Sequence, residues 1–437
     1  MVVRQRGRMG RFRAVAGVAV LVSLTTVAAG GAADEQALPS GSVSLADAVR
    51  AALRYDPTLA AFGFEEEARA ARARQEGRLP NPVLGTAVEN IARFGGDTSQ
   101  ADTAQTTVSL TQVIELGSKR ARQVDVAALD TRLAGRELER ARLDTAARTF
   151  KAFVAGLLAQ ERVALAERTR ALGRDSLAAV RRQLEAGGGS AIEVARAEAA
   201  LAESEAVVAR RTRESRAARV ALAALWGDGE PAIDRLTGSL APLSAPVSLA
   251  TLRARLATTP DLTRWTDAVA RTEAGVALEE ARRVPDLTVR VGARRFVSAE
   301  TNALVAEVAL PLPFFDRNSD AIAEARAHVG KMRAEQRAAE LGAVATLRAD
   351  HEEMTAAYEE ARTLEAEVLP RARAALRETR RGYGEGRLRY LEVLEAERTI
   401  TELEQRWLET LARYHTAAAE VERLTGGPTL VGPGEER

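Results

Sequence analysis

The chain has 437 residues and carries 62 Lys and Arg against 61 Asp and Glu, so no basic excess points to nucleic acid as a partner. It contains no Cys, which excludes disulfides, thiolate metal sites and a lipid anchor on an N-terminal cysteine. Ala, Arg, Glu and Leu dominate and aromatic residues make up only 4%, a composition typical of long helices rather than of a compact mixed core.

Residues 1–33 have the pattern of an export signal. Five arginines between positions 4 and 13 precede an apolar run at Ala14–Ala29, and small residues at 31–33 offer a cleavage site. A membrane-anchoring helix is the alternative, but the apolar run is short for one. We therefore expect the mature chain to start near Asp34, outside the inner membrane and without a lipid at its N-terminus.

The rest of the chain repeats itself. SLADAVRAALRYDPTLAAF, which begins at Ser44, resembles SLATLRARLATTPDLTRW, which begins at Ser248. Pro57 and Pro260 occupy matching places 203 residues apart, and a second pair of prolines has the same spacing. We predict a tandem duplication followed by a C-terminal tail, with the first repeat, a linker, the second repeat and the tail at 34–230, 231–247, 248–427 and 428–437.

Each half is predicted to run helix, strand, loop, strand, very long helix, tight break and long helix. The clearest strand alternates apolar side chains from Leu287 to Ala293 with Arg290 and Arg294 on the other face. In the first half the helical pattern continues from 116 to 186, about 70 residues or about 100 Å of helix. Steps of four and three residues within it predict a coiled-coil seam at Leu143, Ala147, Phe150, Val154 and Leu157. The four strands are expected at about 83–91, 105–113, 286–296 and 303–310.

Four strands with one apolar face need a partner for that face. A soluble sheet half-buried under the helices is one possibility, since alternation alone does not separate it from a membrane sheet. In a membrane the sheet has to close, because no edge can stay unpaired there, and four strands are too few to close. Sharing the barrel among three chains gives about twelve strands and an open lumen. On this argument the sequence predicts a homotrimer with a shared barrel in a membrane.

Four short strings carry a resemblance to a known family. They resemble the outer membrane factor (TolC-like) family, and their forms are most similar to its CzcC-like heavy-metal branch. The resemblance implies a mainly α chain with transmembrane β, whose trimer joins a twelve-stranded barrel to a periplasmic helical coiled-coil barrel. It also implies outer membrane lipid around the barrel, with a periplasmic adaptor and an inner-membrane pump of the RND type as partners. The strings are LPNPVLGTAVEN, LTQVIELGSKRARQ, LPLPFFDRN and GRLRYLEVLEAERT, at Leu79–Asn90, Leu110–Gln123, Leu310–Asn318 and Gly386–Thr399.

The turns between the long helices, at about 185–191 and 382–389, match the hairpin tips of that family. Glycine suits such a turn because it tolerates positive φ and close approach. The resemblance implies that the adaptor contacts the tips, and that carboxylates just beyond the second tip ring the closed aperture. The tip residues are Gly187, Gly188, Gly189, Gly386, Arg387 and Leu388, and the aperture carboxylates are Glu392 and Glu395.

The family gate also pairs a Tyr on one tip with a carboxylate on the other, which implies a bond between Tyr383 and Glu193. The arginine that the family has two residues after the turn glycine is replaced here by Leu388, and Arg387 and Arg389 are the neighbouring candidates for its role. An ordinary solvated helix face is the alternative for the carboxylates.

No catalytic motif, cofactor motif or metal-ligand spacing occurs, and the three His, at 328, 351 and 415, are scattered over helical segments. We therefore expect a non-enzyme without cofactor or resident metal. The favoured function is the passive exit duct of a tripartite efflux pump for heavy-metal cations. The alternatives are a duct for drugs or for type I protein secretion, and a periplasmic coiled-coil structural protein without a pore.

Overall fold

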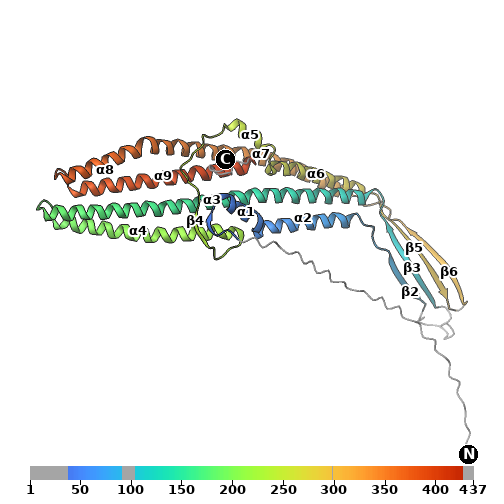
Figure 1. The fold of residues 1–437 in the computed structure, drawn as a ribbon. Coiled ribbons are helices and arrows are strands. Elements are labelled where there is room, and N and C mark those ends of the chain that lie inside the picture. Colours follow the sequence, from blue (N-terminus) through green and yellow to red (C-terminus); the bar gives the residue numbers. More distant parts are fainter. Residues whose placement is uncertain (1–37, 91–103, 298, 427–437) are drawn as a thin grey trace, which may run out of the picture. The chain divides into compact units, whose positions relative to one another are not determined.

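The computed structural model describes residues 38–90, 104–297 and 299–426, which belong to one compact unit beginning at Leu38. The expected signal segment, the loop after residue 90 and the tail after 427 lie outside these residues. Within them the chain is mainly helical (Figure 1). The α-helices are α1 Leu45–Tyr55, α2 Pro57–Glu76, α3 Lys119–Glu185, α4 Ala191–Ala223, α5 Leu249–Leu256, α6 Pro260–Arg282, α7 Ser319–Thr363, α8 Leu369–Gly384 and α9 Tyr390–Thr425.

The main sheet is antiparallel throughout, in the order β2-β3-β5-β6. Its two central strands come from different halves of the sequence, and they pair along their whole length from Gln105↔Phe296 to Ile114↔Leu287. Within the described residues, β2 and β6 each pair on one side only, so both edges of the sheet are open. The strands are β2 Val83–Glu89, β3 Gln105–Ile114, β5 Leu287–Phe296 and β6 Thr301–Ala309.

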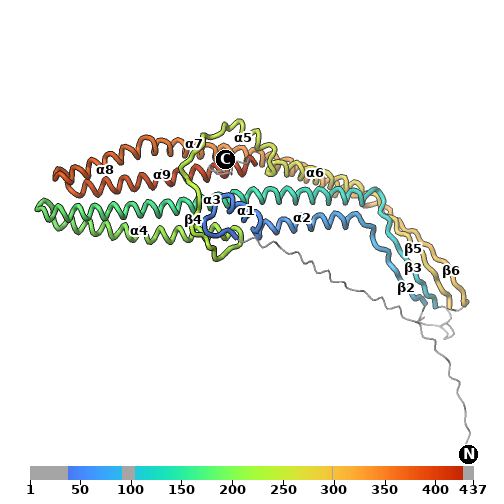
Figure 2. Tube along the Cα trace, in the orientation of Figure 1, coloured from blue at the N-terminus to red at the C-terminus, as the bar shows by residue number. Residues whose placement is uncertain are grey.

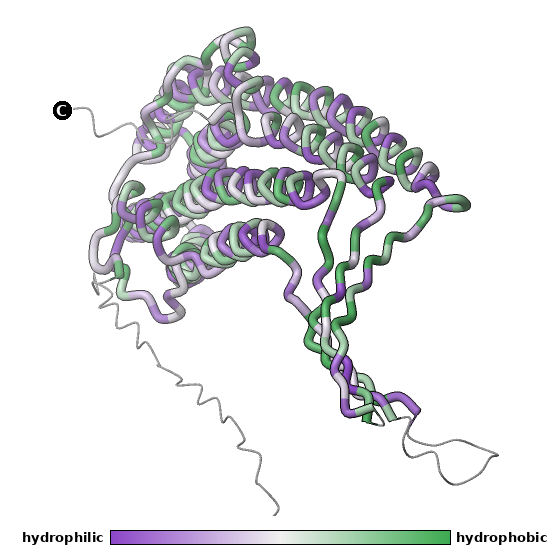
Figure 3. Tube along the Cα trace, turned by 90° about the vertical axis from the view of Figure 1, so that its right-hand side faces the viewer, coloured by the Kyte–Doolittle hydropathy of each residue, from purple (hydrophilic) through white to green (hydrophobic). Residues whose placement is uncertain are grey.

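The sheet has one apolar face, and that face is uncovered. Leu84, Leu110 and Val291 lie side by side across three strands, and their exposed fractions are 73%, 51% and 49%. Leu304 on the edge strand β6 is 86% exposed. Hydrophobic and hydrophilic residues alternate along the strands in Figure 3. No helix among the described residues covers the apolar face, in contrast to the soluble alternative.

The long helices form two hairpins, α3 with α4 and α7–α8 with α9, and their turns lie at the end of the unit remote from the main sheet (Figure 2). The seam expected on α3 is largely buried, since Ala147, Phe150, Val154 and Leu157 are at most 7% exposed. Between α7 and α8 the ladder widens into a π-helical segment, Leu364–Val368, just before Pro370. Pro370 has no N–H to donate, so the regular α-helical ladder is interrupted here, and the π-helical turn lies directly before this interruption.

A second, two-stranded sheet crosses the middle of the helices. β1, Gly41–Val43, pairs in parallel with β4, Ile233–Leu236, inside the stretch that the sequence treats as a linker. The chain then runs over α9, where the Tyr414 hydroxyl donates to the carbonyl oxygen of Ser244 at 2.6 Å and His415 Nε2 lies 2.9 Å from the carbonyl oxygen of Leu240. We call residues 237–247 the strap. These side-chain contacts fix it to the helical core.

Asn318 lies at the turn from β6 into α7, directly before the helix. Its backbone is left-handed at φ 58° and its side chain does not cap α7. Its side-chain amide donates instead to the carbonyl oxygen of Glu279 on α6, at 2.8 Å. Phe314 and Phe315 precede it and are 70% and 104% exposed, so neither ring packs into the described core of this chain.

Candidate gate at the hairpin ends

Both hairpin turns are built around one glycine with positive φ. Gly187 has φ 80° and Gly386 has φ 72°, values that other residues rarely adopt. In each turn an N–H reaches back five residues to close the helix, from Gly188 to Gln183 at 3.0 Å and from Arg387 to Gly382 at 2.8 Å. This is the Schellman arrangement, which explains glycine at both places.

The two hairpins meet just above their turns in a small apolar cluster. The first hairpin contributes Leu177, Val180 and Ala197, and the second contributes Tyr383, Tyr390 and Val393. The rings of Tyr383 and Tyr390 lie 6.0 Å apart and are tilted. Burial, followed by the nearby Glu397 carboxylate, raises the pKa of Tyr390 to about 12. Both phenols are therefore neutral at physiological pH, and the cluster holds the hairpins together mainly by apolar contact.

The expected bond between Tyr383 and Glu193 is not formed. Among the described residues the Tyr383 hydroxyl has no hydrogen-bond partner, although it is buried. Glu193 instead accepts from the backbone N–H of Tyr390, the first residue of α9, at 3.4 Å. A helix N-terminus attracts a carboxylate because its N–H groups are unpaired and its dipole is positive there. The Glu193 carboxylate remains near enough to raise the pKa of Tyr383, after burial as the larger cause.

The two aperture carboxylates differ in their surroundings. Glu392 accepts from the backbone N–H of Arg389 at 2.6 Å, which caps the start of α9. Glu395 lies almost one turn further along α9 and is exposed. Arg387, a candidate for the role of the family arginine that Leu388 replaces, pairs with Glu385 in its own turn. Leu388 packs against Gly382, where an added Cβ would lie 2.8 Å from Leu388 Cδ1.

A buried polar cluster above the tips was missed by the sequence reasoning. Glu397 Oε1 accepts from Ser176 Oγ on α3 and from Arg380 Nη2 on α8, both at 2.6 Å. Ser176 and Glu397 are only 6% and 8% exposed. One carboxylate thus joins three helices across the two hairpins. A signal existed, because Glu397 occupies a place on the otherwise apolar seam Tyr390, Val393 and Ile400.

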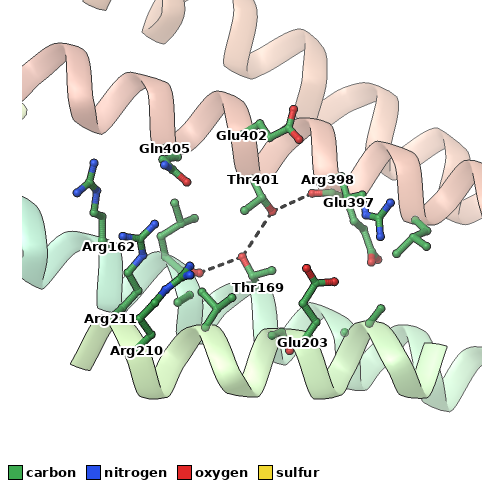
Figure 4. A pocket seen from close by; sticks show the side chains of 17 residues that line it. Arg162, Thr169, Glu203, Arg210, Arg211, Glu397, Arg398, Thr401, Glu402 and Gln405 are labelled. Carbon is green, nitrogen blue, oxygen red and sulfur yellow. Dashed lines mark hydrogen bonds between the residues drawn. The ribbon is translucent and has the colours of Figure 1, made fainter. Parts of the chain in front are cut away.

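A cavity of about 270 Å³ lies above this cluster, and residues of α3, α4 and α9 line it (Figure 4). Arg162, Arg210 and Arg211 gather at one side of it, and Glu203 points in from α4 further along. Thr169 and Thr401 hydroxyls lie 3.5 Å apart across it. Its wall mixes both charges with alkyl side chains and holds no Cys. The described residues contain no group of three His, Asp or Glu side chains placed to hold a metal ion.

The described part of the chain contains no helix that is long and apolar enough to cross a membrane. Residues 48–228 and 252–427 match the outer membrane efflux protein family. The chain belongs to this family. Its members are channel proteins of the outer membrane rather than enzymes, which agrees with the absence of catalytic motifs from the sequence.

Curated relatives agree with the family assignment, and a solved structure shares the fold. The chain is 31% identical to the cobalt-zinc-cadmium resistance protein CzcC of Cupriavidus metallidurans, over 89% of this chain and 91% of the relative. It is 28% identical to the nickel-cobalt-cadmium resistance protein NccC of Alcaligenes xylosoxydans xylosoxydans, over 71% and 73%. Its fold is similar to the open state of the Neisseria gonorrhoeae MtrE outer membrane channel, with TM-score 0.72, 20% identity and coverage of 88% and 89%. The fold is therefore that of TolC-like channels.

Proposed function

We propose that this outer membrane efflux protein is the passive exit duct of a tripartite pump that exports heavy-metal cations. The observation that carries the duct is the main sheet, which has an uncovered apolar face and two open edges. Pairing β6 of one copy with β2 of the next would satisfy both edges and put the apolar face toward lipid. Three copies would give about twelve strands around a water-filled lumen.

The cargo assignment rests on the curated relatives. The two reported above are resistance proteins for cobalt, zinc, nickel and cadmium. With no metal-holding cluster in the described residues, the duct would pass ions without coordinating them. The inner-membrane RND pump would then supply both the energy and the selection, and a periplasmic adaptor would join it to the hairpin turns around Gly187 and Gly386.

We also propose that the chain arose by duplication, with an export signal at 1–33 and repeats at 34–230 and 248–427. The family match in two blocks, 48–228 and 252–427, supports this division. The matching glycine turns of the two hairpins support it as well.

A metal-tolerance assay tests the cargo. A metal-sensitive host carrying the cognate pump and adaptor should gain tolerance to cobalt, zinc or cadmium only when this chain is also expressed. Restored drug resistance or protein secretion without metal tolerance would instead identify the same duct with another cargo. A purified trimer that never conducts in a planar bilayer would contradict the duct itself.

For the gate, we propose that Glu392 and Glu395 ring the aperture of the resting trimer and that adaptor docking separates the hairpins. Three copies of each carboxylate would concentrate negative charge on the axis and attract cations. The double variant Glu392→Ala/Glu395→Ala should raise the conductance of the isolated trimer. Glu365→Ala/Glu367→Ala removes the same charge from the π-helical segment of the same hairpin and should leave the conductance unchanged. Equal conductance in all three proteins would remove the carboxylates from the gate.

Tyr383 takes a different place in this proposal than the family resemblance implies. Its hydroxyl has no hydrogen-bond partner in the described part of the chain, so Tyr383→Phe removes none of the hydrogen bonds seen there and should leave the resting conductance close to that of the parent. Tyr383→Ala should raise it, because it deletes a ring from the apolar cluster between the hairpins. If Tyr383→Phe raised the conductance as much as Tyr383→Ala, the hydroxyl would have to hold the gate closed after all.

A further inference from the structure

The polar face of the main sheet carries charges that are bound to one another. Arg290 on β5 lies between its cross-strand neighbours Thr111 on β3 and Glu307 on β6. Its Nε donates to Thr111 Oγ1 at 3.3 Å and its Nη1 donates to Glu307 Oε2 at 2.9 Å. One guanidinium group thus spans three strands.

A second arginine repeats the arrangement four residues further along the same strand. Arg294 Nε donates to Thr107 Oγ1 at 3.0 Å and Nη1 donates to Gln105 Oε1 at 3.3 Å. Its Nη2 lies 3.6 Å from Glu89 Oε2 on β2. The planar guanidinium fork suits such fixed, multiply bonded positions better than a flexible ammonium group would.

The charges of this face cancel. Counted from the cross-strand register, its charged residues within the four strands are Arg290 and Arg294 against Glu89 and Glu307, two of each sign. The opposite, apolar face carries one charge, Arg295, which lies on β5 directly between Thr106 and Asn302 near the end of the sheet remote from the helices.

We propose that the Arg290–Glu307 and Arg294–Glu89 pairs determine the ion selectivity of the barrel by keeping its lumen wall electrically neutral. This inference rests on the proposed function, since it takes the polar face to be the lumen wall of the trimer. In each pair a positive and a negative side chain lie side by side, so their fields almost cancel at the position of a passing ion. Each broken pair would leave three like charges in the trimer at one level of the barrel. At about 0.1 M salt their field extends about 10 Å, far enough to reach ions in the lumen.

The experiment measures the reversal potential of the purified trimer in a planar bilayer under a KCl gradient. To keep the tip carboxylates from dominating selectivity, every protein also carries Glu392→Ala/Glu395→Ala. In that background Arg290→Gln should shift the reversal potential toward potassium selectivity, and Glu307→Gln should shift it toward chloride selectivity. The double variant Arg290→Gln/Glu307→Gln should return it to the value of the background protein.

Arg295→Gln is the matched control, because it makes the same substitution on the same strand but on the apolar face. It should leave the reversal potential unchanged. Single variants that conduct without a shift, or a shift as large in Arg295→Gln, would overturn the inference while leaving the duct intact. Absence of conductance in the background protein would instead overturn the proposed function. If a single variant fails to form trimers, the exchange Arg290→Glu/Glu307→Arg keeps the test, since it should conduct with background selectivity.

Discussion

Removing the Ser176 hydroxyl should loosen the contact between the two hairpins. Ser176 on α3 donates to Glu397 on α9 at 2.6 Å, whereas the Arg380–Glu397 bond stays within the second hairpin. Ser176→Ala deletes the bond to Glu397 and the longer one that Ser176 Oγ accepts from Arg380 Nη2 at 3.3 Å, and it leaves the buried carboxylate paired with its arginine. The surrounding apolar contacts are untouched, so the variant isolates the hydrogen bonds of this one hydroxyl.

The expected effect follows from the type of bond. A hydrogen bond to a charged group contributes about 1.5–3 kcal/mol. Arg380 still neutralises Glu397 in the variant and is 32% exposed, so water can reach part of this cluster. We therefore expect the lower part of that range, about 1.5–2 kcal/mol, which shifts the equilibrium toward separated hairpins by about 10- to 30-fold.

Spin labels measure this separation directly. The chain has no Cys, so paired cysteines introduced at the exposed Arg182 and Arg387 give one label on each hairpin. Electron-electron distance distributions on the trimer should gain a longer, broader component in Ser176→Ala. Ser204→Ala is the control, because its hydroxyl is similarly buried but donates within α4, to the carbonyl oxygen of Leu201 at 2.7 Å. Identical distributions in parent and Ser176→Ala, or an equal change in Ser204→Ala, would refute the reasoning.

Three further predictions concern other parts of the fold. The raised pKa of Tyr390 means that its stabilising effect is complete below about pH 10 and is lost as the pH rises through about 12; an absorbance titration should contain a component near 12 that Tyr390→Phe lacks. Burial lowers the pKa of His415, so the stability that its neutral ring contributes is complete above about pH 6.5 and is lost on acidification. The melting temperature of His415→Gln should therefore fall less between pH 7 and 5 than that of the parent, and an equal fall would exclude His415 as a source of the acid sensitivity. Gly117 has φ 70°, and an added Cβ would lie 2.7 Å from Val284 Cβ, so Gly117→Ala should destabilise by about 2–3 kcal/mol in denaturant titrations, whereas Gly275→Ala, in open space on α6, should stabilise slightly.

Patterns with a strict period were predictable from the sequence. The strand around Val291 and the seam through Phe150 each depend on which face is buried, and this repeats every two or about 3.5 residues. The turn glycines were predictable because few other residues adopt positive φ. Such features are local, and the fold could be derived largely from them.

Contacts between distant segments could not be read from local patterns. β1 is only three residues long, and it forms because β4, from the other side of a long hairpin, lies beside it. The expected Tyr383–Glu193 bond is not formed, and the Glu193 carboxylate accepts from a backbone N–H at the start of α9 instead. Ser176 and Glu397 are 221 residues apart, so only the packing of α3 against α9 brings them together.

The π-helical segment before Pro370 sets how far α8 is rotated about its axis relative to α7. A widened turn adds one residue to the ladder, and one residue corresponds to about 100° of rotation around a helix axis. α7 can therefore keep its contacts with α6 and α9 while α8 turns a different side inward, the side that carries Tyr383. Deleting a single residue from this segment would leave the contacts of α7 in place but rotate α8 about its axis. Tyr383 would then no longer point toward the first hairpin.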